Sequence, residues 1–187
     1  MIFKNKRWSA VVTLNARLQP DARSDLEDAL EPLMQQHGHR ITGGGSLLSE
    51  EGEILECDLE IDLASDSDAS VGNVIDAFEA LLAPKRSRIK LKGKETAVEF
   101  GAQEGLALYL NGSDLPAHVY EECDVNHVFD ECERLLDDAG HIHSHWEGPS
   151  ETAFYMYGPS FDEMHRLISP LLASYPLCGG CRVERTA

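Results

Sequence analysis

The stretch ILECDLEIDL, residues 54–63, alternates apolar and acidic side chains along its length. The apolar residues occupy one set of alternate positions: Leu55, Cys57, Leu59, Ile61 and Leu63. The carboxylates occupy the other set, which we name the acidic ladder: Glu56, Asp58, Glu60 and Asp62. Successive side chains of a β-strand point to opposite faces of its sheet, so this pattern predicts a strand with one buried face and one open, acidic face.

The segments around this strand extend it to a complete unit. Before it, residues 8–17 alternate as a strand, residues 22–33 repeat apolar side chains at helical spacing, and residues 41–48 form a partner strand. After it, residues 71–82 have the apolar spacing of a helix, and residues 86–100 contain two strands joined by a tight turn. The order strand, helix, strand, strand, helix, strand is that of the split βαβ, or ferredoxin-like, unit, with one strand appended.

The second half of the chain repeats this order. Strand patterns at 105–112, 142–146, 151–158 and 181–186 alternate with helical patterns at 128–139 and 160–172. The segments HGHRITGGGS and AGHIHSHWEGPS follow the first helix of each half, which indicates a duplication. We therefore predict an α+β fold of two tandem ferredoxin-like units, each an antiparallel sheet with its helices on one face. The expected units are residues 1–103, with the extra C-terminal strand, and residues 104–187.

A basic stripe accompanies the acidic ladder in the first unit. Arg86, Arg88, Lys90 and Lys92 alternate along one strand, and the usual strand order 4-1-3-2 places them one strand away from the ladder, across Val11 and Thr13. One interpretation is an exposed sheet face whose charges balance internally. The other is a docking surface for a basic protein or for the second half of the chain, because four like charges on one strand face repel each other unless cations offset them.

Three histidines alternate on a predicted strand of the second unit. His141, His143 and His145 should therefore point to one sheet face, and we expect three tyrosines on the same face: Tyr109, Tyr155 and Tyr157. Such a face could bind a small molecule, or two imidazoles could converge on one ion. Histidines beside aromatic residues are also common as plain polar cover of a sheet. We favour polar cover, and expect neither a tightly held metal nor a cofactor.

The cysteines do not complete a metal site with these histidines. Cys178 and Cys181 lie in a CGGC segment that leads into the last strand, at the opposite sheet edge from the histidine strand. Three strand spacings separate those edges by roughly 14 Å, which is too far for ligands of one zinc ion. A redox dithiol is normally activated at a helix N-terminus, which this segment lacks. We interpret it as a glycine-rich turn.

Composition excludes several classes of protein. The 187 residues contain 33 Asp and Glu against 16 Lys and Arg, a net charge of -17 that repels nucleic acid. No stretch approaches the roughly 20 apolar residues of a membrane span, and the N-terminus lacks the features of a signal peptide. The five scattered cysteines do not form a disulfide framework. We expect a reduced, cytoplasmic protein.

Two hypotheses of function follow. The sequence contains no nucleophile elbow, phosphate loop or dinucleotide fingerprint, so we lean away from an enzyme without excluding one. The first hypothesis is a non-catalytic interaction or regulatory protein that docks a basic protein through its open sheet faces, and that could form a homodimer through its sheet edges. The alternative is a small-molecule or metal-binding protein, possibly an enzyme, that uses the His/Tyr face of the second unit.

Overall fold

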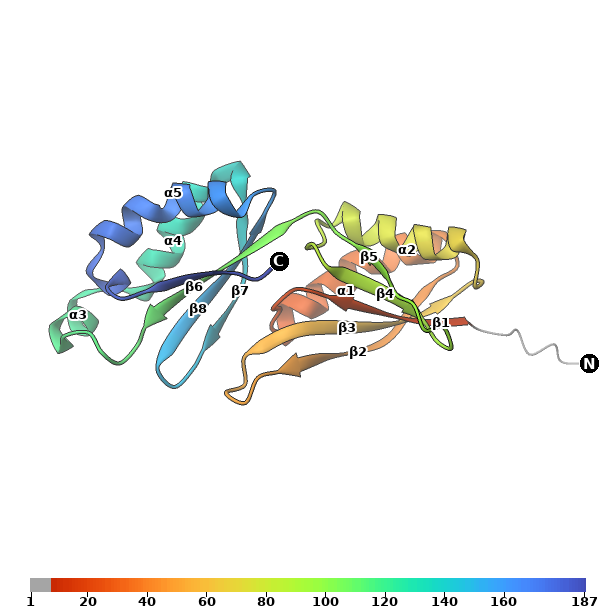
Figure 1. Ribbon diagram of the computed structural model, residues 1–187, viewed down its shortest axis with the longest axis horizontal. Helices are drawn as coiled ribbons and strands as arrows, with labels where there is room; N and C mark the ends of the chain where they lie inside the picture. Colours follow the sequence, from red (N-terminus) through yellow and green to blue (C-terminus); the bar gives the residue numbers. More distant parts are fainter. Residues whose placement is uncertain (1–7) are drawn as a thin grey trace, which may run out of the picture.

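The computed structural model describes residues 8–187 and contains two antiparallel sheets, which lie end to end in Figure 1. The first sheet has the order β2 (Arg40–Leu48), β3 (Ile54–Leu63), β1 (Trp8–Leu14), β4 (Ser87–Leu91), β5 (Val98–Phe100). The second has the order β7 (His141–Glu147), β8 (Glu151–Gly158), β6 (Glu104–Asn111), β9 (Arg182–Arg185). Apart from the appended β5, both sheets have the 4-1-3-2 arrangement, so the prediction of an α+β fold with two ferredoxin-like units is confirmed.

Helices α1 (Pro20–Gln36) and α2 (Asp68–Ala80) cover one face of the first sheet. Leu30 of α1 and Val74 of α2 are fully buried with the inward side chains of β1 and β3, such as Val12 and Leu59. These inward positions follow the alternation that the sequence predicts. The opposite face of the sheet has no helix over it in the described part of the chain, and there the acidic ladder lies.

Helices α4 (Val125–Leu136) and α5 (Phe161–Ser174) cover one face of the second sheet. Val128 and Ile168 pack there against Leu108 and Met156, all with no exposed surface. Two features differ from expectation. A short helix, α3 (Ala117–Glu122), lies outside the predicted helical segments, and α1 continues through Pro32 to Gln36, beyond the predicted range 22–33.

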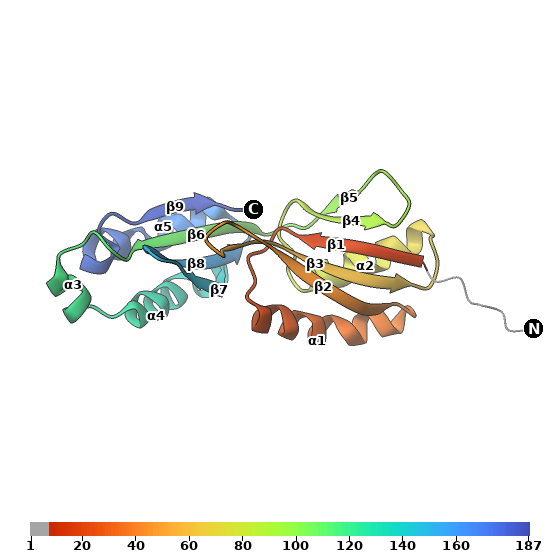
Figure 2. The same cartoon turned by 90° about the horizontal axis from the view of Figure 1, so that it is seen from below.

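The two units share part of their core. Tyr109, Tyr155 and Trp146 of the second sheet belong to the same buried cluster as the core of the first unit. In Figure 2 the turn between β2 and β3 lies over the second sheet. Strand β5 ends at Phe100 and β6 begins at Glu104, while the expected division into residues 1–103 and 104–187 stays a prediction.

Candidate functional site

The acidic ladder lies on the outer face of the first sheet, and its two central residues are paired with both neighbouring strands. Glu60 is opposite Val11 on β1 and Gly43 on β2, and Asp58 is opposite Thr13 and Gly45. Asp58 and Glu60 are exposed, whereas Cys57, Leu59 and Ile61 between and beside them are buried. The predicted two-sided character of this strand is therefore present in the structure.

One detail of the alternation is wrong at the start of β3. The pairing of β2 with β3 shifts between Leu47 and Leu48, so that Leu48 is opposite Ile54 and Leu47 is opposite Glu56. Leu55 is left as the extra residue and is only partly buried, while Ile54 takes the buried position. Beyond this point β3 keeps one register with β1 from Cys57 to Leu63, while its pairing with β2 shifts once more, between Ile41 and Gly43.

The ladder's counter-charges are unevenly distributed. Arg88 of the basic stripe donates two hydrogen bonds to Glu56, at 2.9 and 3.1 Å, and Arg40 lies 3.9 Å from Asp62. Asp58 and Glu60, in the middle of the ladder, have no ion pair with any of residues 8–187. Lys90 is opposite Val11, one strand away from Glu60. The central two carboxylates therefore remain open to a cation from outside.

Two glycines of β2 leave the space beside these carboxylates unfilled. A Cβ atom added at Gly45 would meet no atom within 4 Å, and one at Gly43 would meet only the Glu60 carboxylate at 3.9 Å. Neither residue has a positive φ angle, so an ordinary side chain fits at both positions. Gly44 differs, because its added Cβ would lie 2.5 Å from the backbone oxygen of Asp58. Local sterics thus account for Gly44 but not for Gly43 or Gly45.

The three strand histidines do not share one face, so that prediction is wrong. His141 is opposite Tyr157 and Ile142 is opposite Met156, but the next pair is Ser144 with Tyr155. His143 is the additional residue of a β-bulge, and the bulge turns His145 to the helix-covered face, opposite Phe154. Alternation is a reliable guide to side-chain direction only while each residue has one partner.

The tyrosine face of the second sheet is not open, contrary to expectation. Tyr109, Tyr155 and Tyr157 do lie on one face, but they are only 2%, 1% and 4% exposed. The connection from β1 to α1 and the turn between β2 and β3 cover them. This arrangement closes the rings of Tyr109 and Tyr155 to a ligand from solvent, whereas Tyr157 also lines a groove between the units.

Glu53 is the centre of the polar contacts that join the two units. Its carboxylate accepts hydrogen bonds from the hydroxyls of Tyr109 and Tyr155, both at 2.6 Å, and from the guanidinium of Arg17. The backbone N–H of Arg17 donates to the Tyr157 hydroxyl at 2.8 Å. Burial is the main cause that raises the pKa of Tyr109 to about 12, so the phenol stays neutral and donates its proton to Glu53.

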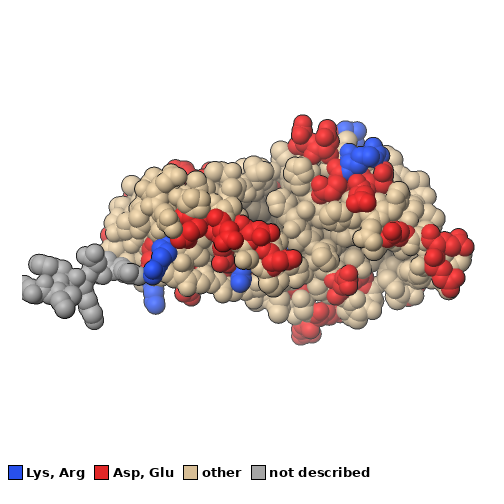
Figure 3. Space-filling model, turned by 180° about the vertical axis from the view of Figure 1, so that it is seen from behind, with Lys and Arg blue, Asp and Glu red and all other residues tan. Residues whose placement is uncertain are grey.

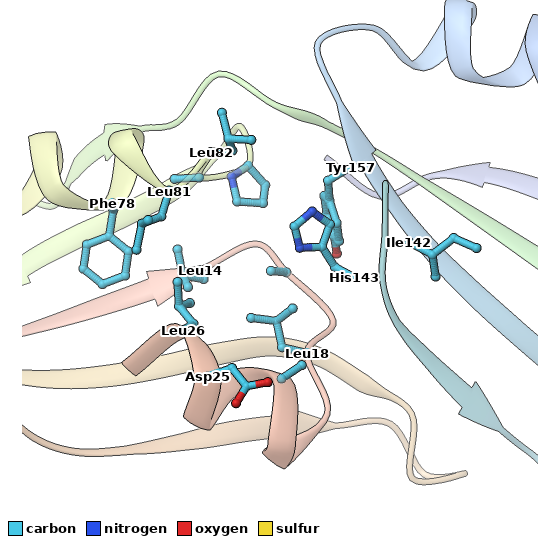
Figure 4. A pocket seen from close by; sticks show the side chains of 14 residues that line it. Leu14, Leu18, Asp25, Leu26, Phe78, Leu81, Leu82, Ile142, His143 and Tyr157 are labelled. Carbon is cyan, nitrogen blue, oxygen red and sulfur yellow. The ribbon is translucent and has the colours of Figure 1, made fainter. Parts of the chain in front are cut away.

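A groove of about 390 Å³ lies between the units, on the helix side of the first sheet. In Figure 4, Phe78, Leu81 and Leu82 lie on one side of it, and the rings of His143 and Tyr157 face them from the second unit. The His143 and Tyr157 rings meet edge to face, with centroids 5.5 Å apart. Of the predicted His/Tyr set, these two line the groove; Ile142 also belongs to the lining, with its side chain turned away in Figure 4. Sequence reasoning missed the groove, because its walls come from segments far apart in the chain.

Acidic side chains also gather near this groove. In Figure 3 they form a band on the rear face of the first unit, which leads toward the hollow between the two units. Helix α1 contributes exposed acidic residues one turn apart, Asp21, Asp25 and Asp28, and Asp25 lines the groove. The surroundings of the groove therefore attract cations.

Three further features of the sequence concern metal binding, membrane helices and the cysteines. Within residues 8–187 there is no group of three or more side chains suited to hold a metal ion, and no helix is long and apolar enough to cross a membrane. All five cysteines are free thiols. Burial raises the pKa of Cys178 to about 11, so this thiol of the CGGC segment is not an activated nucleophile.

No protein-family model matches the chain, and no curated protein is similar to it in sequence. Solved structures are similar only in outline. A protein of unknown function from Galdieria sulphuraria is 14% identical, with 96% of this chain and 98% of that chain covered and a TM-score of 0.30. The regulatory subunit of aspartate kinase from Thermus thermophilus is 9% identical, with 87% and 92% covered and a TM-score of 0.29. The first two RRM domains of a yeast poly(U)-binding protein are 10% identical, with 95% and 99% covered and a TM-score of 0.26. Likenesses this distant say nothing about activity or ligands.

Proposed function

We propose that the chain is a non-catalytic interaction protein that docks a cationic partner protein on the outer face of its first sheet. The observation that supports this most strongly is the pairing of two glycines with two carboxylates. Gly43 and Gly45 lie directly opposite Glu60 and Asp58, which have no ion pair within residues 8–187. The partner that fits is an extended segment rich in lysine or arginine.

The glycines favour docking because the fold alone does not need them. A glycine in a strand loses more backbone entropy on folding than other residues and contributes no side-chain packing. A β-branched residue at position 45 would meet no steric obstacle, since an added Cβ has no atom within 4 Å. Bare backbone at such a position is typical of strands that another backbone approaches closely.

The charges of the protein determine the sign of the partner's charge and the direction in which the partner binds. The net charge of -17 attracts cations over long range and accelerates their association. On the same face, Lys90 of β4 lies on the far side of β1 from the ladder, and the neighbouring Arg88 is already paired with Glu56. A partner with cations on one side and a carboxylate on the other would therefore bind in one direction only.

We also propose a cytoplasmic location for this protein. Its support is the state of the cysteines, since all five are free and two of them, Cys57 and Cys132, are fully buried. Proteins that keep unpaired thiols are typical of reducing compartments. Intact-mass measurement of material from its host, with free thiols alkylated in denaturant so that the buried ones also react, would show five alkyl groups if this is correct. Fewer would indicate oxidised cysteines and contradict it.

The docking proposal is tested with a fluorescent 12-residue peptide in which lysine alternates with valine, by anisotropy at several salt concentrations. Two variants remove the site: Asp58→Thr with Glu60→Thr, and Gly45→Thr. The control is Glu122→Gln with Asp130→Asn, which removes two negative charges, as the ladder variant does, at exposed positions of the second unit. We expect both site variants to weaken binding about tenfold or more, and the control to change it less than about twofold.

Two outcomes would contradict the proposal. If the control weakened peptide binding as much as the ladder variant does, net charge alone would account for binding. If Gly45→Thr left binding unchanged, the open backbone beside the ladder would have no part in it. Thermal unfolding of each variant establishes that the fold is retained.

A further inference from the structure

The groove between the units has the properties of a small-molecule site. Its volume of about 390 Å³ is within the range of ligand pockets, and its walls are mostly aliphatic. The first unit contributes most of the lining, and the second unit closes it with His143 and Tyr157. The acidic ladder is on the other face of the first sheet, so this site is separate from the proposed docking surface.

The charged chemistry of the groove comes from one residue. Among residues 8–187, Asp25 is the only charged side chain that lines it, apart from the titratable His143 and Tyr157. Asp25 has no ion pair with any residue in the described range 8–187. Partial burial is the main cause that lowers the pKa of His143, followed by the nearby His141, so the neutral imidazole is favoured. A cation in the groove would meet one carboxylate and no opposing charge from the lining.

Leu82 at the edge of the groove is held in an unfavourable conformation. Its N–H donates to the carbonyl of Glu79, and the N–H of Ala83 donates to that of Phe78, which together close the end of α2. In this motif the residue at position 82 adopts a left-handed conformation, with φ of 62°, where glycine is normally preferred. Leu82 is nevertheless 53% exposed and lines the groove. Because the side chain is largely exposed, its packing contributes little stability to offset the strained backbone. A strained residue that the fold does not need indicates a role in binding.

From these observations we propose that the groove binds a small molecule with an apolar body and one amino group. The apolar body lies between Leu82 and Leu18 on one side and Tyr157 on the other, and the ammonium group lies near Asp25. The acidic band that leads toward the hollow between the units raises the local concentration of such amines.

The test uses three probes that share an indole ring and a two-carbon chain but differ in charge: tryptamine, tryptophol and indole-3-acetate. Their affinities are measured by amide chemical shifts in ¹H–¹⁵N NMR titrations. We expect tryptamine to bind about fivefold more tightly than tryptophol and indole-3-acetate least tightly, with shifts at Leu18, Leu82 and His143.

Two variants and a matched control locate the interaction. Asp25→Asn should remove the preference for tryptamine and leave tryptophol binding intact. Leu82→Gly should weaken both by about threefold or more, while the melting temperature stays the same or rises because strain is relieved. Asp28→Asn, one turn further along α1 and outside the groove lining, should change nothing.

The proposal is overturned if tryptamine and tryptophol bind equally, if neither binds, or if Asp28→Asn acts like Asp25→Asn. It is also overturned if Leu82→Gly leaves the affinities unchanged. None of these outcomes bears on the docking face, because the ladder carboxylates and Gly45 are not part of the groove.

Discussion

The hydroxyl of Tyr155 donates a hydrogen bond of 2.6 Å to the carboxylate of Glu53, across 102 residues of sequence. Glu53 belongs to the turn between two strands of the first sheet, and Tyr155 is in the middle of a strand of the second. The bond therefore holds the second unit to the first. The Tyr155 side chain that makes it is only 1% exposed, because it is covered by the first unit and by its own sheet.

Removal of this hydrogen bond should lower the stability of the whole protein. Tyr155→Phe deletes only the hydroxyl, and we expect the free energy of unfolding to fall by about 2 kcal/mol, the usual range for a bond to a charged acceptor. Glu53→Ala should cost more, because it leaves Arg17 and two tyrosine hydroxyls without their acceptor. Urea unfolding of both variants measures this. Equal stability of Glu53→Ala and wild type would contradict the account of the junction.

A second contact between the units should depend on acidic pH. Hydrogen bonds from Lys85, at 2.8 Å, and from the backbone of Phe161, at 2.7 Å, lower the pKa of Glu104 to about 2. A carboxylate with a lowered pKa stabilises the folded state above its unfolded pKa and loses that effect as the pH falls through the folded pKa. We expect Glu104→Gln to be less stable than wild type at pH 6. The difference should shrink between about pH 4.5 and pH 2. A difference that does not change with pH would show that Glu104 acts without its charge.

His39 should make the protein sensitive to mild acid. It is 3% exposed, and its Nδ1 accepts a hydrogen bond of 3.1 Å from the backbone of Ala64. Burial is the main cause that lowers its pKa from 6.5, and His37 adds to the effect. The unfolded chain then binds the proton more readily, so stability falls as the pH drops below 6.5.

The variant His39→Asn keeps an acceptor for Ala64 but cannot titrate. Its free energy of unfolding should fall less steeply than that of wild type between pH 7 and pH 5. Equal slopes for the two proteins in urea titrations at these pH values would refute the role of His39.

The protein should become more stable when the central ladder carboxylates or Gly45 are replaced. Asp58→Thr with Glu60→Thr relieves repulsion and adds β-branched side chains, so we expect a gain of up to about 1 kcal/mol. Gly45→Thr should gain a similar amount, because it reduces the entropy lost on folding. Thermal unfolding measures both. A loss of stability in either variant would mean that the fold itself requires these residues, and the docking account would lose its main support.

The accuracy of sequence reasoning differed between the two sheets for a physical reason. The acidic ladder could be predicted because β3 pairs with β1 in one unbroken register from Cys57 to Leu63, so a period of two translates directly into a face. The histidine strand has the same period, but the bulge at His143 inserts a residue without a partner, and no local signal in the sequence marks it.

The contacts between the units could not be predicted at all. Glu53 lies 56 residues from Tyr109 and 36 from Arg17, and each residue alone looks like an ordinary exposed or half-buried position. Alternation indicated that three tyrosines share a face, but it cannot tell whether water or the other unit covers that face. The groove depends on the same packing and was missed for the same reason.

The central claim is that a cationic partner lies on β2 and β3, over the glycines. The most direct measurement is a ¹H–¹⁵N NMR titration of the whole protein with the lysine–valine peptide. We predict that the largest shifts occur at Gly43, Gly45, Asp58 and Glu60, with small shifts at the acidic residues of α1. Shifts of similar size at Asp21, Asp28 and the ladder, or shifts concentrated on α1, would show that the peptide follows the net charge and would contradict a docking site on this face.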